Sequence, residues 1–154
     1  MNDNEKLIEK FYSAFQSKDY VTMQGLYHPQ ARFSDPVFTS LNSDEVKAMW
    51  QMLISRGKDL RIDFNSIKAD DSRGSCHWEA WYTFSRTGKK VHNVIDASFE
   101  FNDGLILTHQ DSFNFWTWSR QALGIAGLFL GWSPALKNKV RATAASGLQK
   151  FMQR

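Results

Sequence analysis

The sequence predicts an α+β fold in which helices come first and an antiparallel sheet follows. Apolar residues recur with the helical period up to Gly57, and then with a period of two from residue 60 to residue 116. Short turns separate the alternating segments, and consecutive strands joined by short turns pair antiparallel. The length of 154 residues fits one domain with one core.

Two helices are expected before residue 30. Asn2 can cap the first helix, with Glu5 three residues later as its capping-box partner. A short second helix should start near Asp19. It should stop by His28, because Pro29 disfavours helical geometry in the residue before it.

The third helix has the clearest apolar stripe. Asn42 or Ser43 can cap its start, and Gly57 stands where a C-terminal cap belongs. Its apolar residues fall three and four positions apart: Val46, Met49, Trp50, Leu53 and Ile54. Four strands should follow, over residues 60–65, 75–86, 91–101 and 105–116.

The tail differs from the rest of the chain. Residues 123–132 are apolar with three glycines, and we expect an apolar loop or short helix that is too short to span a bilayer. Ser133 and Pro134 then start an amphipathic basic helix. This tail could cover a pocket mouth, form a dimer seam or rest on a membrane, and packing on its own domain is favoured. We therefore divide the chain into residues 1–116 and a tail, 117–154, within the same domain.

Charge and cysteine content narrow the possible partners. Asp111 is the last acidic residue, and six cations and no anion follow it, whereas the first 111 residues carry 13 cations and 16 anions. A solvated basic helix face is favoured over an acidic partner. No aromatic-glycine pattern of an RNA-binding type is present, so nucleic acid is not expected. Cys76 is the only cysteine and no secretory signal is recognisable, so a cytoplasmic location is the default.

Three aspartates are candidate catalytic residues. Asp35 stands before Pro36, where an aspartate commonly caps a turn, and Asp111 shares a strand face with aromatic residues. Asp96 lies in mid-strand, on the face opposite the mostly apolar one. In an apolar cavity the pKa of Asp96 would rise, and the neutral acid could donate a hydrogen bond to an oxyanion. In solvent Asp96 would be unremarkable.

No metal or cofactor is expected. The four histidines, His28, His77, His92 and His109, lack short-range ligand spacing. No glycine-rich phosphate loop and no nucleophile elbow is present.

The segments 33–37 and 94–99 resemble those that carry the catalytic base and the oxyanion-hole acid of ketosteroid isomerases, in the nuclear transport factor 2-like superfamily. The resemblance covers about residues 3–116 and implies a cone-shaped fold around an apolar pocket. It implies that Asp35 abstracts a proton next to a carbonyl and that Asp96 stabilises the enolate oxygen, with Asp111 or His109 in support. Phe11 stands where that family has a second oxyanion donor, a tyrosine, and Tyr12 lies about 100° around the helix.

Other branches of the superfamily suggest alternatives. Limonene epoxide hydrolases resemble the chain in carrying two strand aspartates, here Asp96 and Asp111, although Val94 stands where their arginine would be. Polyketide cyclases use a pocket aspartate as acid or base. A non-catalytic ligand-binding or dimerisation module is the third alternative. We expect a homodimer and a small hydrophobic ligand, with membrane contact by the tail less favoured. The predicted pocket residues are Phe11, Tyr12, Trp50, His92, Val94, His109 and Phe113.

Overall fold

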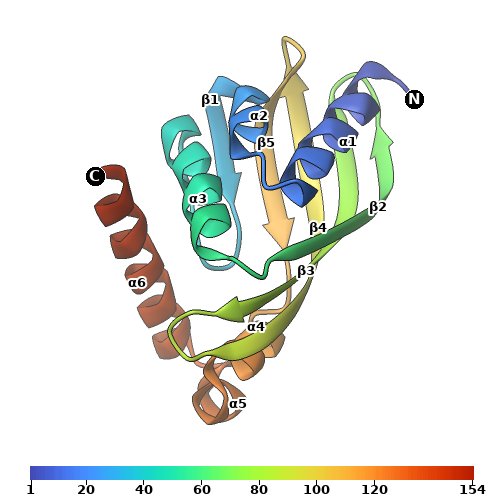
Figure 1. The fold of residues 1–154 in the computed structure, drawn as a ribbon. Coiled ribbons are helices and arrows are strands. Elements are labelled where there is room, and N and C mark those ends of the chain that lie inside the picture. The colour runs from blue at the N-terminus through green and yellow to red at the C-terminus, as the bar shows by residue number, and fades with distance from the viewer.

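Helices cover the concave face of a curved, unclosed five-stranded sheet in the computed structural model, which describes all 154 residues (Figure 1). The helices are α1 (Asp3–Gln16), α2 (Tyr20–Gly25), α3 (Ser43–Arg56), α4 (Phe115–Leu123), α5 (Ile125–Leu130) and α6 (Pro134–Met152). The strands are β1 (Tyr27–Ser34), β2 (Arg61–Ala69), β3 (Arg73–Phe84), β4 (Lys89–Asn102) and β5 (Leu105–Ser112). The predicted α+β class is confirmed.

The predicted caps organise the helix starts. Asn2 and Asn42 each accept a hydrogen bond from the backbone N–H three residues on, and Glu5 and Glu45 complete both capping boxes. Asp19 caps α2 by accepting from the N–H of Thr22. These short-range hydrogen bonds need only neighbouring residues, which explains why the sequence pattern located them.

The strand β1 is absent from the sequence prediction. It lies at the sheet edge and pairs parallel with β5, in the order β1-β5-β4-β3-β2. The pairing is irregular between Tyr27 and Arg32, and Pro29 lies in this stretch. Proline lacks the N–H that a regular ladder needs, so it is tolerated on an edge strand and obscures the strand pattern.

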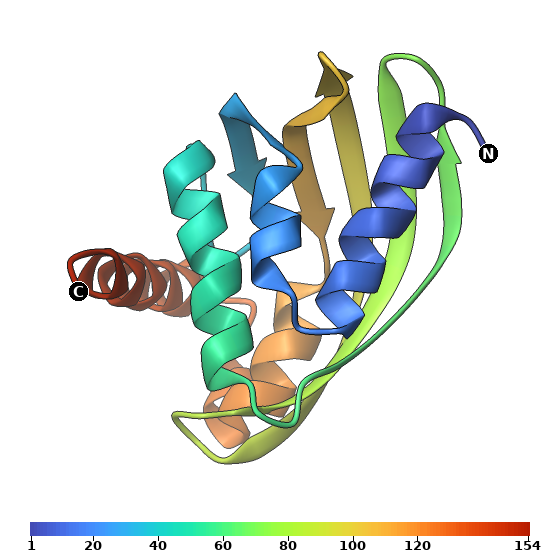
Figure 2. The same ribbon diagram turned by 45° about the horizontal axis from the view of Figure 1, so that its top comes forward.

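The last strand ends earlier than predicted. β5 stops at Ser112 instead of residue 116, because Asn114 caps α4 by accepting a hydrogen bond from the N–H of Thr117 (3.0 Å). A short helix, α5, follows α4 and contacts it. Both helices follow the end of β5 and lie near the β3–β4 hairpin, where α4 contacts β4 (Figures 1 and 2). No helix combines the length and apolar character needed to cross a membrane.

Strand β4 shows the difference between the two faces of the sheet most clearly. Its residues alternate strictly between buried and exposed from Val91 to Asn102. The buried face meets α1 and α3 in a core rich in aromatic side chains, while the other face is open to solvent.

Helix α6 packs against α3 (Figure 1). Leu148 is buried in the main core, the Nε of Arg141 donates to the carbonyl of Pro36 (2.9 Å), and Gln149 donates to Glu45 (3.1 Å). These contacts place the tail beside the segment that carries Asp35.

Candidate active site

A cavity of about 540 Å³ opens between the concave sheet face, α3 and the C-terminal helices. Its wall is mainly apolar, as is typical of a small-molecule site. Polar side chains interrupt the wall, and those of Asp35, Tyr82, Asn93 and Asp111 come from the sheet and the segment after β1. Helix α6 contributes Leu136, Val140 and Ala144, so the tail forms part of the cavity.

Asp35 follows β1 and is held by its own turn. Its Oδ1 accepts hydrogen bonds from the backbone N–H groups of Val37 (2.7 Å) and Phe38 (2.6 Å). The Oδ2 atom accepts no hydrogen bond from the protein, and the side chain lines the cavity. The aspartate is thus both a turn cap and a carboxylate with one oxygen available to a ligand.

Desolvation makes Asp35 a much stronger base than an ordinary aspartate. Burial, with a smaller contribution from the charge of Asp111, raises the pKa of Asp35 to about 7. The two backbone N–H groups and the charge of Arg141 oppose this shift. A carboxylate with this pKa can both take up and release a proton near neutral pH.

Asp111 is fixed by a buried hydrogen-bonded chain. Trp50 Nε1 donates to the hydroxyl of Tyr27 (2.8 Å), which bonds His109 Nδ1 (2.8 Å), and His109 Nε2 bonds Asp111 Oδ1 (3.0 Å). Because the hydroxyl oxygen of Tyr27 accepts the hydrogen bond from Trp50, its own hydrogen is free to be donated to His109 Nδ1. The imidazole of His109 then carries its hydrogen on Nε2 and donates it to Asp111. The side chain of His109 is fully buried and that of Asp111 is 3% exposed.

Tyr82 brings a hydroxyl group to the same cavity. Its oxygen accepts a hydrogen bond from Trp118 Nε1 (2.8 Å), and the phenol hydrogen has no protein acceptor. Burial, together with the charge of Asp35, raises the pKa of Tyr82 to about 12, and the hydrogen bond from Trp118 opposes this shift. Tyr82 therefore remains a hydrogen-bond donor at neutral pH.

Asn93 is a site residue that the sequence reasoning did not select. It is 9% exposed, lines the cavity, and makes no side-chain hydrogen bond within the protein. The amide of Asn93 is not sealed in the core and has no protein partner, so it can bond a polar group of a ligand in the cavity. The signal was visible in the sequence, because Asn93 is the one polar residue on the otherwise apolar face of its strand.

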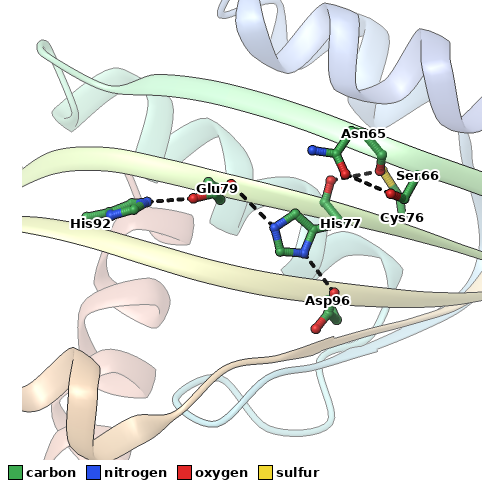
Figure 3. Close-up of polar contacts among 7 residues, drawn as sticks. All are labelled: Asn65, Ser66, Cys76, His77, Glu79, His92 and Asp96. Atoms are coloured by element: carbon green, nitrogen blue, oxygen red, sulfur yellow. Dashed lines mark hydrogen bonds and ion pairs between the residues drawn. The ribbon is translucent and has the colours of Figure 1, made fainter.

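Asp96 lies on the other side of the sheet. Its side chain is 79% exposed and its Oδ1 bonds His77 Nδ1 (2.9 Å), in a row that continues through Glu79 to His92 (Figure 3). The expected role as an oxyanion donor beside Asp35 is therefore wrong. Its proposed pairing with Asp111 is wrong as well, because Asp111 faces its β4 partner Ala97 and so lies on the opposite face.

The predicted pocket residues fall into three groups. Trp50 and Phe113 line the cavity. Phe11, Tyr12 and His109 are buried in the core behind it, because aromatic side chains fill the space between α1 and the sheet. The expectation that His92 and Val94 line the pocket is wrong, because strand alternation turns both outward with Asp96.

The structure contains no cluster of three histidine, cysteine or acidic side chains suited to a metal ion.

The curved sheet, the helices on its concave face and the C-terminal helix define a nuclear transport factor 2-like cone fold. Residues 8–109 match the model of the SnoaL-like domain, so the chain belongs to this family. Comparison with curated protein sequences gives no significant match.

Solved structures share the fold at low sequence identity. An NTF2-like protein of unknown function from Burkholderia pseudomallei is 18% identical with a TM-score of 0.69, over 79% of this chain and 98% of that one. An LEH-like epoxide hydrolase from M. tuberculosis is 17% identical with a TM-score of 0.66, over 86% and 96%. IdmH from Streptomyces antibioticus, a proposed polyketide cyclase, is 21% identical with a TM-score of 0.64, over 78% and 97%. At these identities the likeness concerns the fold.

Proposed function

We propose that the cavity catalyses proton transfer next to the carbonyl group of a small hydrophobic compound. The observation that carries this proposal is Asp35: a carboxylate in an apolar wall, with a pKa of about 7 and one oxygen, Oδ2, free of protein hydrogen bonds. A base whose pKa lies near the working pH combines adequate ionisation with adequate proton affinity.

Asp35 would remove a proton from the carbon next to the carbonyl, and the C–H electron pair would move into an enolate. The negative charge then develops on the carbonyl oxygen, which needs a hydrogen-bond donor. Tyr82 lies close enough for the charge of Asp35 to affect its pKa, and its phenol hydrogen is free. Tyr82 would thus take the place of the donor that is missing at Phe11, and Asn93 would supply a second donor.

The protonated Asp35 then determines the product class. Return of the proton to a different carbon gives isomerisation. Attack of the enolate carbon on a second carbonyl of the same molecule gives cyclisation, with the proton delivered to the new alkoxide. The proposed cyclase activity of IdmH, which has the same fold, agrees with the second outcome. Asp111, held by His109, would keep the pKa of Asp35 raised through its charge.

Hydrogen–deuterium exchange at the α-carbon of a hydrophobic ketone tests the proposal without knowledge of the natural substrate. With β-tetralone in D₂O, the wild-type protein should accelerate exchange, and Asp35→Asn should remove the acceleration. Asp96→Asn is the matched control, because it makes the same chemical change on the solvent face. Acceleration that survives Asp35→Asn, or that Asp96→Asn also removes, would contradict the assignment.

A further inference from the structure

The chain exposes a group of large apolar side chains at one end of the molecule. We call it the α5 surface, and its members are Trp116, Ile125, Leu128, Phe129, Leu130 and Trp132, each between 36% and 75% exposed. They belong to α4, α5 and the turn after α5, which follow the end of β5 near the β3–β4 hairpin (Figures 1 and 2). Contiguous exposed apolar groups of this kind usually mark a surface that meets a partner.

Glycine residues explain why these side chains point away from the protein. A Cβ atom on Gly127 would collide with the backbone oxygen of Ser119, and one on Gly131 would collide with the Ser119 hydroxyl. Helix α5 therefore presses its small residues against α4, and its large residues remain outside. The tight backbone contact holds the α5 surface in place instead of letting it fold into the core.

Both exposed tryptophans have their polar atom satisfied inside the protein. Trp116 Nε1 donates to the carbonyl of Leu128 (3.2 Å), and Trp132 Nε1 donates to the carbonyl of Phe129 (2.7 Å). The rings therefore need no polar partner and can enter an apolar medium at low cost.

Cations surround this surface. Arg120 stacks over Trp116 with its Cζ 4.6 Å from the ring centroid, and Lys137 Nζ lies 5.7 Å from the ring of Phe115. Lys89 lies against Gly124 at the start of α5, where an added Cβ would be 2.7 Å from its Cε. None of the three cations forms an ion pair with a carboxylate, and the chain has no acidic residue after Asp111.

We propose that the α5 surface docks on an anionic lipid bilayer, with its apolar side chains in the interfacial region and its cations at the headgroups. Apolar insertion combined with surrounding basic residues is the combination that binds peripheral proteins to such membranes. A second copy of the chain fits less well. A two-fold contact would bring the same unpaired cations of both copies together.

The helices that carry the α5 surface also contribute to the cavity wall. Leu123, Ala126 and Leu136 line the cavity and lie in or beside the same helices. Docking would therefore bring the part of the cavity wall that these residues form close to the bilayer.

Co-sedimentation with lipid vesicles tests the docking proposal independently of any catalytic activity. We expect wild-type protein to bind vesicles of phosphatidylglycerol and phosphatidylcholine much more strongly than vesicles of phosphatidylcholine alone. Added salt should weaken the binding, because it screens exposed charges. The double variant Phe129→Ser with Trp132→Ser should lower the partition coefficient at least about tenfold, given the apolar area that it removes.

Two further variants make the test selective. Val21→Ser removes an equally exposed apolar side chain on α2, a helix that lies away from α4 and α5 (Figure 1), and should bind like wild type. Lys89→Gln with Lys137→Gln should weaken binding to anionic vesicles only, and it leaves the apolar side chains intact if the serine variant fails to fold. Circular dichroism checks the fold of each variant. The proposal is overturned if the wild-type protein does not bind anionic vesicles, or if the serine variant binds them as strongly as the wild-type protein does. It is overturned too if gel filtration shows a dimer that the serine variant dissociates.

Discussion

The two faces of the sheet carry the same kind of pair in opposite surroundings. On the inner face, His109 bonds Asp111 at 3.0 Å with side chains 0% and 3% exposed. On the outer face, His77 bonds Asp96 at 2.9 Å with side chains 27% and 79% exposed. The distances are nearly equal, so the geometry of the bond does not distinguish the pairs.

Burial makes the difference between them. Water stabilises each outer charge by itself, so the outer pair adds little to the free energy of unfolding. On the inner face no water can replace a lost hydrogen-bond partner, so each donor and acceptor depends on its neighbour in the hydrogen-bonded chain. The same burial that makes the inner network costly to break raises the pKa of Asp35 to about 7. Polar groups on the inner face therefore depend on protein partners, whereas those on the outer face have water as an alternative partner.

The largest expected contrast is in stability. Asp111→Ala leaves the N–H groups of His109 and Trp78 without their acceptor, and each buried unsatisfied donor costs about 1–3 kcal/mol. We expect urea denaturation to show a loss of about 2–6 kcal/mol in the free energy of unfolding. Asp96→Ala should change the free energy of unfolding by less than about 1 kcal/mol. Equal losses in the two variants would remove the distinction between the faces.

The next largest effect concerns catalysis. Tyr82→Phe should lower the rate of ketone exchange by about 10²-fold, the usual effect of losing one oxyanion donor. Tyr12→Phe is the matched control. Its hydroxyl is buried without a hydrogen-bond partner and does not line the cavity, so its removal should leave the rate unchanged and raise stability by about 1 kcal/mol. A rate loss in the Tyr12 variant would point to a different donor.

The pH dependence of stability sharpens the assignment of Asp35. Its pKa is about 7 in the folded protein and near 3.8 when unfolded, so the folded state binds more protons in between and loses stability as the pH rises. The amide introduced by Asp35→Asn cannot titrate, so the free energy of unfolding of this variant should rise relative to that of wild type by about 2–3 kcal/mol from about pH 5 to about pH 8. This follows from about 1.36 kcal/mol per pKa unit. Denaturant titrations at both pH values measure this gain. A constant difference between the two proteins would mean that the carboxyl group titrates normally.

The smallest effect is expected on the outer face. The hydrogen bond that His77 donates to Asp96, with a smaller contribution from Glu79, raises the pKa of His77. The pair therefore stabilises the fold at low pH and loses this contribution as the pH rises from about 6.5 through the folded-state pKa. Asp96→Asn should lower the pKa of His77 in an NMR titration, with less than about 1 kcal/mol of change in stability. An unchanged His77 titration would show that the outer pair is absent in solution.

The sequence by itself determined the local elements. Asn2, Asp19 and Asn42 cap helices through hydrogen bonds within three residues, and Asp35 caps its own turn. These contacts depend only on neighbours along the chain, so a pattern of residue types locates them. Strand alternation likewise placed Asn93 and Asp96 on opposite faces of β4.

Only the tertiary structure decided which face closes over a cavity and what shares it. The motif around Asp96 suggested a catalytic acid, but the helices cover the other face and leave Asp96 in water. Tyr82 and Asn93 join Asp35 because β3, β4 and the segment after β1 line one cavity, although they lie far apart in the sequence. Burial, and with it the pKa and the cost of an unpaired group, belongs to the assembled fold, because it depends on what covers a side chain.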